Sequence, residues 1–230
     1  AARRVSEVSD PLGDGISSAQ LLDCFGDDLT VVNGARVSFH KESEWSATGL
    51  STKDTKLVKY LAKHGHWTPF AHPQLRFRIK MPIFTAREWY RHTVGFARNE
   101  VSRRYVTEEP QFYEPHMWRL KAESAKQGSG EAVDAPAVQK VMKWWNIATA
   151  DYYKRLLADG WAPEMARMIL PQSTYTEFIE TGSLYAYARL VGLRTSPGAQ
   201  FEINLYAKAI ADLILPHFPV SWGALMERET

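Results

Sequence analysis

The sequence predicts a single α+β domain, a compact fold in which helices flank a mixed or antiparallel sheet. Its 230 residues are 45% hydrophobic, which is enough to bury one core, and we expect one domain over residues 1–230. One segment alternates like a half-buried strand, and several others carry apolar residues at helical spacing. Strand and helix signals are interspersed along the chain without an internal repeat, as in α+β proteins.

The clearest strand signal lies in residues 74–80. Its apolar side chains alternate with Arg76, Arg78 and Lys80, as expected of a strand with one face in the core. Residues 173–181 are β-branched and aromatic, and they predict a second strand.

Helices are predicted from apolar spacing and from capping residues. Ser51 and Asp54 form a capping-box signature before the first helix, and Gly65 ends it. Pro82 suits the first turn of the next helix. The predicted helices cover residues 52–64, 82–92, 136–158, 163–169, 184–193 and 203–214.

Other segments predict loops and turns. Residues 1–30 are polar and punctuated by Gly, Asp and Ser, so we expect loops around a short element. Residues 31–41 mix β-branched residues with a turn-like Asn-Gly pair. Residues 106–135 read as a long loop, and such loops are often functional.

Composition narrows the class of protein. The net charge of +2 and the 23% of charged residues do not indicate disorder, a polybasic tail or a membrane or nucleic-acid partner. No apolar run is long enough for a transmembrane helix, and the first ten residues lack the apolar core of a signal peptide. Cys24 is the one cysteine, which favours a reducing compartment, so we expect a soluble cytoplasmic protein.

Neither a metal site nor a cysteine nucleophile is expected. His64, His66 and His72 are spaced like ligands, but no acidic cluster adjoins them. Cys24 has no basic neighbour in the sequence that would lower its pKa.

The densest polar cluster spans residues 87–105 and contains five arginines, one histidine and two glutamates. Arginine donates paired hydrogen bonds in a fixed plane, which suits phosphate and carbonyl groups. Aromatic residues are interleaved, so the cluster predicts a site for a phosphorylated ligand that carries a ring. A solvated, salt-bridged helix followed by a turn would explain the same composition.

The order of residues in this cluster resembles the signature of flavin-dependent thymidylate synthases, which is close to RHRxxSxNExSxRY. Arg91-His92 match its start, and Asn99-Glu100-x-Ser102-x-Arg104-Tyr105 match its end. Further segments resemble family blocks in the family's order: ARVSFHKES (35–43), LVKYLAKHGHWTPFAH (57–72), FRIKMPIFTAREWYRH (77–92), MARMILPQSTYTEF (165–178) and LRTSPGAQFEI (193–203). The resemblance is strongest over residues 35–214.

The resemblance implies a fold like that of thymidylate synthase-complementing proteins, and a methyltransferase that converts dUMP to dTMP. The carbon would come from 5,10-methylenetetrahydrofolate and the hydride from FADH2, which NADPH regenerates. Neither a metal nor an enzyme thiol is implied. The expected assembly is a homotetramer with active sites shared between subunits, and no nucleic-acid or membrane partner is implied.

Residue roles are carried over position by position. Arg194 matches the arginine that favours ionisation of uracil N3, and it is expected to be catalytic together with Ser102 and Arg104. The implied dUMP site comprises Glu88, Arg91, Glu100, Ser102, Arg103, Arg104, Arg167 and Arg194. The implied FAD site comprises Thr68, Arg91, His92, Thr93, Arg98, Glu100, Ser183, Tyr185 and Arg189.

Residue type alone allows simpler roles for two of these arginines. Arg167 on a helix is most often a surface residue. Arg194, close to Pro197 and Gly198, could be part of a helix C-terminus.

The chain departs from the signature around its centre. Thr93 occupies the third position of RHR, and one extra residue lies between His92 and Asn99. We hypothesise that Arg98 restores the missing positive charge beside the flavin.

Other departures leave room for a different activity. Ala71 replaces a common glutamate, Tyr185 stands where an arginine is frequent, and the KQGS segment, residues 126–129, could add a contact to substrate or flavin phosphate. A second hypothesis is therefore another one-carbon modification of a pyrimidine nucleotide, such as hydroxymethylation. A third is a non-catalytic nucleic-acid-binding protein that stacks bases on the residues of 87–105.

Overall fold

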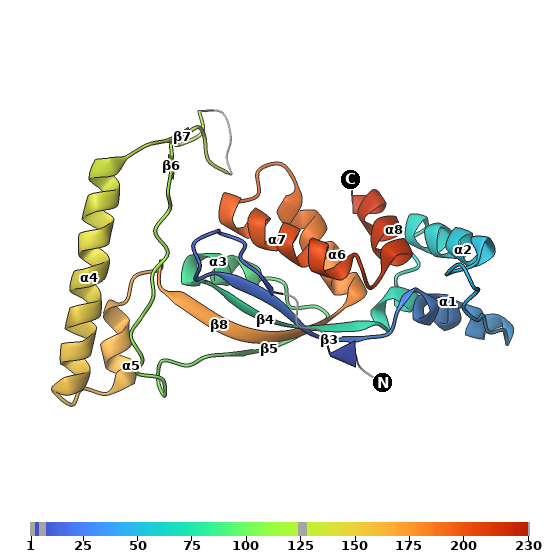
Figure 1. The fold of residues 1–230 in the computed structure, drawn as a ribbon, viewed down its shortest axis with the longest axis horizontal. Coiled ribbons are helices and arrows are strands. Elements are labelled where there is room, and N and C mark those ends of the chain that lie inside the picture. Colours follow the sequence, from blue (N-terminus) through green and yellow to red (C-terminus); the bar gives the residue numbers. More distant parts are fainter. Residues whose placement is uncertain (1–2, 5–7, 124–127, 230) are drawn as a thin grey trace.

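The structure is a computed structural model that describes residues 3–4, 8–123 and 128–229. Its framework is a six-stranded antiparallel sheet with strand order β1-β3-β4-β8-β5, in which β2 also pairs with β3 (Figure 1). The strands are β1 Arg3–Arg4, β2 Val8–Ser9, β3 Ser18–Phe25, β4 Gln74–Pro82, β5 Phe96–Glu100 and β8 Tyr175–Ser183. A separate two-stranded ribbon consists of β6 Trp118–Arg119 and β7 Ala132–Val133.

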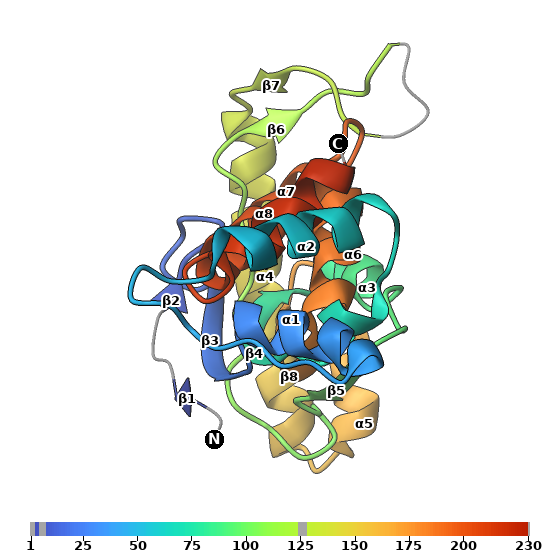
Figure 2. The same ribbon diagram turned by 90° about the vertical axis from the view of Figure 1, so that its right-hand side faces the viewer.

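The helices lie mainly on one face of this sheet and at its two ends. Helices α3, α6 and α7 cover one face, α4 and α5 lie at one end, and α1, α2 and α8 lie together at the other end (Figures 1 and 2). None of the described helices is long and apolar enough to cross a membrane. The helices are α1 Asp28–Arg36, α2 Thr52–Lys63, α3 Ile83–Trp89, α4 Pro136–Ala158, α5 Pro163–Ala166, α6 Leu184–Thr195, α7 Phe201–Ile214 and α8 Pro219–Glu229, with 3₁₀ turns η1 Val37–Phe39, η2 Thr68–Ala71 and η3 Arg167–Ile169.

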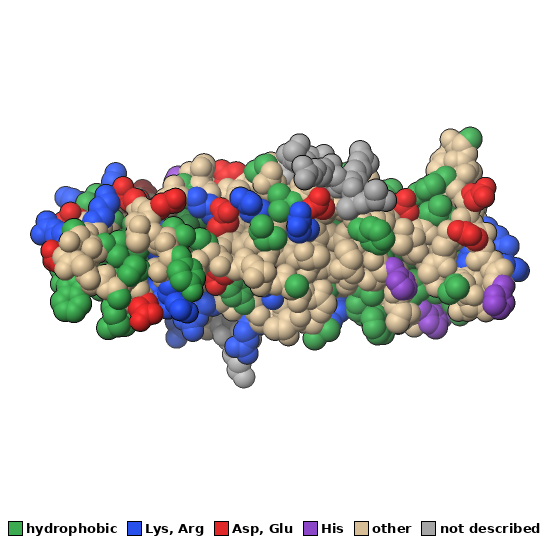
Figure 3. All heavy atoms as spheres, turned by 90° about the horizontal axis from the view of Figure 1, so that it is seen from below, with side chains coloured by type: hydrophobic (Ala, Val, Ile, Leu, Met, Phe, Trp, Pro, Cys, Tyr) green, Lys and Arg blue, Asp and Glu red, His purple; other side chains and the backbone are tan. Residues whose placement is uncertain are grey.

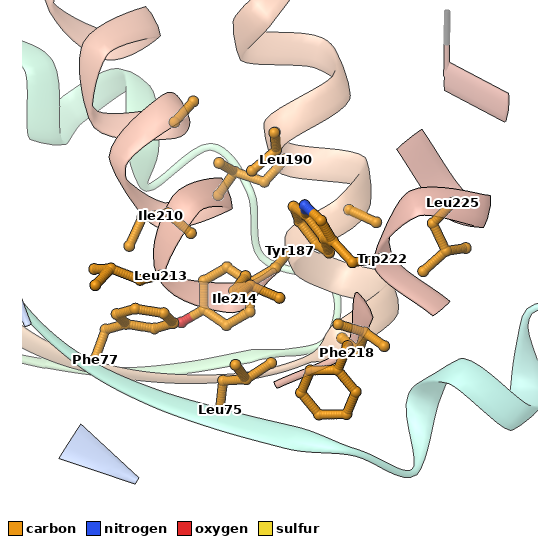
Figure 4. Close-up of a cluster of buried hydrophobic side chains, with 14 of the residues drawn as sticks. Leu75, Phe77, Tyr187, Leu190, Ile210, Leu213, Ile214, Phe218, Trp222 and Leu225 are labelled. Carbon is orange, nitrogen blue, oxygen red and sulfur yellow. The ribbon is translucent and has the colours of Figure 1, made fainter. Parts of the chain in front are cut away.

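The core lies between the sheet and helices α6, α7 and α8. Leu75 and Phe77 of β4 are fully buried, and the Phe77 ring meets Tyr187 of α6 edge-on, with ring centroids 5.1 Å apart. Ile214 and Trp222 close the same cluster from α7 and α8 (Figure 4). The alternation that predicted a half-buried strand at 74–80 is confirmed, because its basic residues lie on the opposite face.

The two central strands direct two helices toward each other. Strand β4 continues directly into α3, and β8 continues directly into α6. These strands are antiparallel, with Pro82 opposite Tyr175 at one end and Gln74 opposite Ser183 at the other. The helices therefore start at opposite ends of the same strand pair and run back over the same face.

Most predicted helices are confirmed, with boundaries shifted by few residues. The helix at 136–158 has the predicted limits, while the segment 163–169 divides into α5 and η3. The helix predicted over 82–92 ends at Trp89, so His92 lies in a turn. The second predicted strand is shifted to 175–183.

The N-terminal expectations were partly wrong. Residues 1–30 contain the eight-residue strand β3 and the start of α1, not mainly loops. The Asn33-Gly34 pair lies inside α1, which starts at a capping box between Asp27 and Thr30. The Asn33 side chain accepts a hydrogen bond from the backbone N–H of Ser43 at 2.7 Å.

Two further elements were not predicted. Strand β5 has the sequence FARNE, which lacks apolar alternation, and its pairing with β8 creates it. Helix α8 begins at Pro219, after the turn at 215–217, and its N-terminus is bound by Asp28. The predicted loop at 106–135 is mainly irregular, but it also contains the short β6–β7 ribbon.

Asp28 should contribute measurably to stability. Its buried carboxylate accepts hydrogen bonds from the backbone N–H groups of Val220 (3.0 Å) and Ser221 (2.8 Å), so it caps α8 from α1. We expect Asp28→Ala to lower the free energy of unfolding by about 2–3 kcal/mol, measured by urea denaturation, because two buried donors lose their acceptor. Asp28→Asn keeps one acceptor oxygen and should lose less. A change within about 0.5 kcal/mol for Asp28→Ala would contradict this role.

Candidate active site

The convergence of α3 and α6 creates a cluster around Arg194. Its Nε donates to Nε2 of His92 at 2.9 Å, and its Nη1 forms an ion pair with Glu88. The Arg194 side chain is only 15% exposed. Asn204 of α7 donates to the Arg194 carbonyl at 3.2 Å, so the backbone of this arginine is also fixed. The guanidinium is therefore held in one orientation by Glu88 and His92, and the backbone that carries it is held by α7.

His92 is held in its neutral form. Burial, together with the positive charges of Arg194, Arg98 and Arg189, lowers its pKa to about 4. Because Nε2 accepts the hydrogen bond from Arg194, we assign the remaining ring proton to Nδ1. His92 thus orients the arginine without adding a competing positive charge.

A cavity of about 530 Å³ is lined by residues of α6, of η2 and of the segment after α3. The rings of Trp67 and Tyr185 stack at its wall, with centroids 5.8 Å apart. The exposed Arg189 adds a positive charge at the wall and forms no ion pair with the described residues. Its lining comprises Trp67, Ala71, Gln74, Val94, Gly95, Ser183, Tyr185, Ala186 and Arg189.

The cavity and the arginine cluster are built from the same two segments. The turn after α3 contributes His92 to the cluster and Val94 to the cavity. Helix α6 contributes Arg194 to the cluster and Arg189 to the cavity. The same two segments thus carry a cavity able to accept a ring and an oriented guanidinium.

The remaining predicted nucleotide residues form a second group after β5. Glu100 accepts a hydrogen bond from Thr176 at 2.6 Å, and the Ser102 hydroxyl accepts from the backbone N–H of Arg104 at 3.3 Å. The exposed Arg104 lies 3.9 Å from Glu164 of α5.

Arg103 and Arg167 lie in the same region as this second group. Arg103 donates to the Glu108 carbonyl at 2.6 Å and stacks over Tyr153 of α4. Arg167 is exposed in η3, which directly follows α5. Helix α5 lies at the α4 end of the molecule, whereas α6 covers the sheet (Figure 1). Within the described part of one chain, no hydrogen bond or ion pair joins these residues to Arg194.

The other predicted flavin residues differ in how far they are buried. Arg91, Thr93 and Thr68 are exposed near the cavity segments. Arg98 is instead largely buried, and it forms an ion pair with Glu180.

Comparisons with known proteins show the family of the chain. A family model described as thymidylate synthase complementing protein matches residues 20–220. A flavin-dependent thymidylate synthase from Thermus thermophilus is 39% identical over 209 residues, covering 90% of this chain and 75% of that protein. The chain belongs to the flavin-dependent thymidylate synthase family. Another member, from Thermosipho africanus, is 37% identical over 213 residues, which cover 90% of this chain and 90% of that protein.

Solved structures show the same fold. The crystal structure of the UMP/dUMP methylase PolB from Streptomyces cacaoi, bound with 5-Br UMP, has a TM-score of 0.78 and 27% identity, covering 99% of this chain and 97% of that one. The 5-Br dUMP complex has a TM-score of 0.77 and 28% identity, covering 96% of each chain. The α+β fold predicted for this family member is confirmed.

The resemblance alone missed several cavity residues of this family member. Trp67 directly precedes the predicted Thr68, Gln74 begins β4 six residues after it, and Val94 and Gly95 follow the predicted Thr93. Their closeness in sequence to predicted residues was the available signal. Ala71, a departure from the family pattern, also lines the cavity. Two residues of the KQGS segment, 126 and 127, lie outside the described residues, and the described residues contain no group of three or more His, Cys, Asp or Glu that could hold a metal.

The neutral state of His92 leads to a pH prediction. Its pKa is lowered from about 6.5 to about 4 in the folded protein, so the unfolded chain binds the proton first as pH falls. Stability should therefore decrease from about pH 6.5 towards pH 4. His92→Gln keeps an acceptor for Arg194 but cannot titrate. We expect its urea midpoint to fall less than that of the wild type between about pH 7.5 and pH 5. An equal or larger fall in the variant would refute the assignment.

Proposed function

We propose that this chain converts dUMP to dTMP, taking a carbon unit from 5,10-methylenetetrahydrofolate and a hydride from flavin that NADPH reduces. The observation that carries the proposal is that one pair of segments, α6 and the end of α3 with the residues after it, holds the oriented Arg194 guanidinium and also lines the cavity of Trp67 and Tyr185. The family membership of the chain supports the same reaction.

Arg194 is the residue that we assign to activating the pyrimidine. Glu88 and His92 occupy Nη1 and Nε, which leaves further N–H donors of the guanidinium for a substrate carbonyl. A guanidinium at the uracil edge stabilises the anion formed when N3 loses its proton, and this makes C5 more nucleophilic. Cys24, the one cysteine of the sequence, is buried in β3, two strands away from β8, so no thiol is assigned to this activation.

The cavity residues fit a flavin. Stacked aromatic side chains accept flat rings, and Arg189 supplies a positive charge for a phosphate. Ser183 is occupied as the cap of α6, because its hydroxyl accepts from the Ala186 N–H at 3.1 Å. When bound, reduced flavin supplies the hydride that completes the methyl group. We assign Thr68, Arg91, His92, Thr93, Glu100, Ser183, Tyr185 and Arg189 to this site, with Trp67 in addition.

The nucleotide site is proposed to be shared between subunits. Arg194, Glu88 and Arg91 would meet the pyrimidine in one chain, while the arginines of the second group after β5 would meet the phosphate from a neighbouring chain. This division explains why the two groups do not join within one chain. The second group comprises Glu100, Ser102, Arg103, Arg104 and Arg167.

An exposed apolar face on α4 supports such an assembly. Val141, Trp145 and Tyr152 follow helical spacing, yet they are 61%, 49% and 55% exposed in one chain. Hydrophobic side chains gather at this end of the molecule (Figure 3). A soluble helix normally buries such a face, so we propose that copies of this chain cover it in a homotetramer. The single cysteine favours a reducing compartment, and we propose the cytoplasm.

A second candidate keeps the site but changes the substrate or product. The solved relative PolB is described as a UMP/dUMP methylase, so UMP is a candidate substrate here. Hydroxymethylation is the alternative for the product. The nucleic-acid hypothesis lacks a supporting observation, because the arginines of 87–105 make separate contacts and do not form one basic face.

The test is an assay of the purified protein with methylenetetrahydrofolate and NADPH, and with either dUMP or UMP. Flavin absorbance is recorded together with the nucleotide mass. The proposal predicts a yellow protein and a nucleotide product heavier than dUMP by one CH₂ group. A product that also carries an added oxygen would establish hydroxymethylation, and a colourless, inactive protein would refute the proposal.

Arg194→Ala should lower kcat by about 10²–10³-fold, because it removes stabilisation of the pyrimidine anion. Arg194→Lys should recover only part of the rate, since lysine cannot contact both Glu88 and His92 with the same planar geometry. The matched control is Arg87→Ala, which removes an exposed arginine from the same end of α3. Equal activity of the Arg194→Ala and Arg87→Ala variants would exclude the proposed role.

The assembly proposal predicts that Trp145→Glu lowers the molar mass measured by light scattering after gel filtration, because a charge would be placed in an apolar interface. Lys140→Glu introduces the same charge on α4 outside the apolar face and should keep the wild-type mass. A monomeric wild type, or a Trp145→Glu variant of unchanged mass, would contradict the assignment of this face.

A further inference from the structure

We propose that Arg98 and Glu180 are a buried positioning pair for the uridylate site, and that Arg98 acts on this site through Glu180 without contacting the flavin. The inference rests on the proposed function. The inference gives a role to Arg98, which lies in the part of the signature with one extra residue. Both side chains of the pair lie inside the fold.

The sheet brings the two residues together. Strand β5 is an edge strand that pairs with β8, and its register places Arg98 directly opposite Glu180. Opposed residues in a ladder project from the same face. Phe96, two residues before Arg98, shares this face and packs against Tyr187 of α6, with ring centroids 5.0 Å apart. The pair therefore points toward the layer of helices that carries the site.

Glu180 is fully buried, with 0% of its side chain exposed, and Arg98 is 15% exposed. Arg98 Nε forms the ion pair, and Trp89 Nε1 lies 3.2 Å from each carboxylate oxygen. Burial raises the pKa of Glu180, while Arg98 and Trp89 act in the opposite direction. Removing either charge leaves the other without its partner in a water-poor environment, so the two residues depend on each other.

The contacts of this carboxylate link the two elements, α3 and β5, through which one chain contributes to the proposed nucleotide sites. Trp89 directly follows Glu88, the partner of Arg194, in α3. Arg98 lies two residues before Glu100 in β5. Glu180 thus fixes the end of α3 and strand β5 to the same point on β8. A shift of either element would move Glu88 or Glu100.

The surrounding residues fit the pair closely. The Arg98 guanidinium lies 4.8 Å from the centroid of the Phe96 ring. Phe96 itself lies over Gly182, where a Cβ atom would come within 2.5 Å of the ring. A side chain at position 182 would therefore displace Phe96 and the guanidinium above it.

The flavin contact expected from the sequence is the competing assignment. Nη2 of Arg98 is buried and makes no hydrogen bond within the described part of the chain, so it is the atom that such a contact would use. Glu180 is too deeply buried to touch a ligand. Its loss should therefore change KM for dUMP if the pair positions the site, but not if Arg98 serves only as a flavin contact.

The experiment uses the full-length protein with four changes: Arg98→Met, Glu180→Gln, the double variant, and the control pair Arg78→Met/Glu177→Gln. The control removes an exposed arginine–glutamate pair, 3.5 Å apart, between neighbouring strands of the same sheet. For each protein, KM for dUMP, kcat, the Kd for FAD and the melting temperature are measured.

The proposal predicts that both single variants raise KM for dUMP by about tenfold. The double variant has no unpaired buried charge but lacks the same link between β5 and β8, so its KM should be raised about as much as in either single variant, with wild-type affinity for FAD. The control should change KM by less than about twofold. Because the double variant removes both charges, it remains informative if a single variant fails to fold.

Two results would overturn the inference. Loss of FAD affinity in both variants that lack Arg98, with normal affinity in Glu180→Gln, would assign Arg98 to the flavin. A lower melting temperature with unchanged KM for dUMP would assign the pair to stability alone. A wild type that turns over no pyrimidine nucleotide refutes the proposed function and this inference with it, whereas an active wild type with unaffected single variants refutes the inference alone.

Discussion

The antiparallel pairing of β4 with β8 is the constraint on which the candidate site depends. Each strand passes directly into a helix, and because the strands run in opposite directions, α3 and α6 return over the same face from opposite ends. Residues about one hundred positions apart, Glu88 and Arg194, are thereby brought into an ion pair. A one-residue slip of this pairing would turn every side chain of a strand to the opposite face of the sheet. The last turns of α3 and α6 would then no longer meet.

Charge placement follows from this framework. Burial and the charges of three arginines keep the His92 imidazole neutral. Two of these arginines are held by carboxylates, Arg194 by Glu88 and Arg98 by Glu180. A buried ion pair contributes little net stability, since desolvation of the charges offsets most of their attraction. Its effect is to fix geometry, because either charge alone is costly at that depth. The charge of Arg194 is thus held ready for a ligand at a position set by Glu88, whereas Arg98 is held inside the fold by Glu180.

Much of the fold could be predicted from local patterns. The alternation at 74–80 and the apolar spacing at 136–158 correspond to β4 and α4, because those patterns reflect burial and helical geometry directly. Strand β5 could not be found in this way, since its pairing with β8 is a tertiary interaction that FARNE does not encode locally. The helical conformation of Asn33-Gly34 likewise depends on the distant Ser43.

Only part of the candidate site could be predicted from the sequence. Sequence resemblance selected Arg194, Ser183, Tyr185 and Arg189. In the structure Arg194 lies in the last turn of α6, and the other three residues line the cavity. Resemblance could not reveal Trp67, since the stacking partner of Tyr185 is apparent only when η2 and α6 are placed together. It also could not reveal the ion pair of Arg98, because Glu180 lies 82 residues away in sequence.

The most direct test of the account is a crystal structure of the protein with FAD and dUMP bound. The account predicts that the uracil edge lies within hydrogen-bond distance of Arg194 in one subunit, with the flavin in the cavity lined by Trp67 and Tyr185. It also predicts that Arg104 and Arg167 of a neighbouring subunit contact the phosphate. A nucleotide bound away from Arg194, or a flavin outside that cavity, would contradict the account.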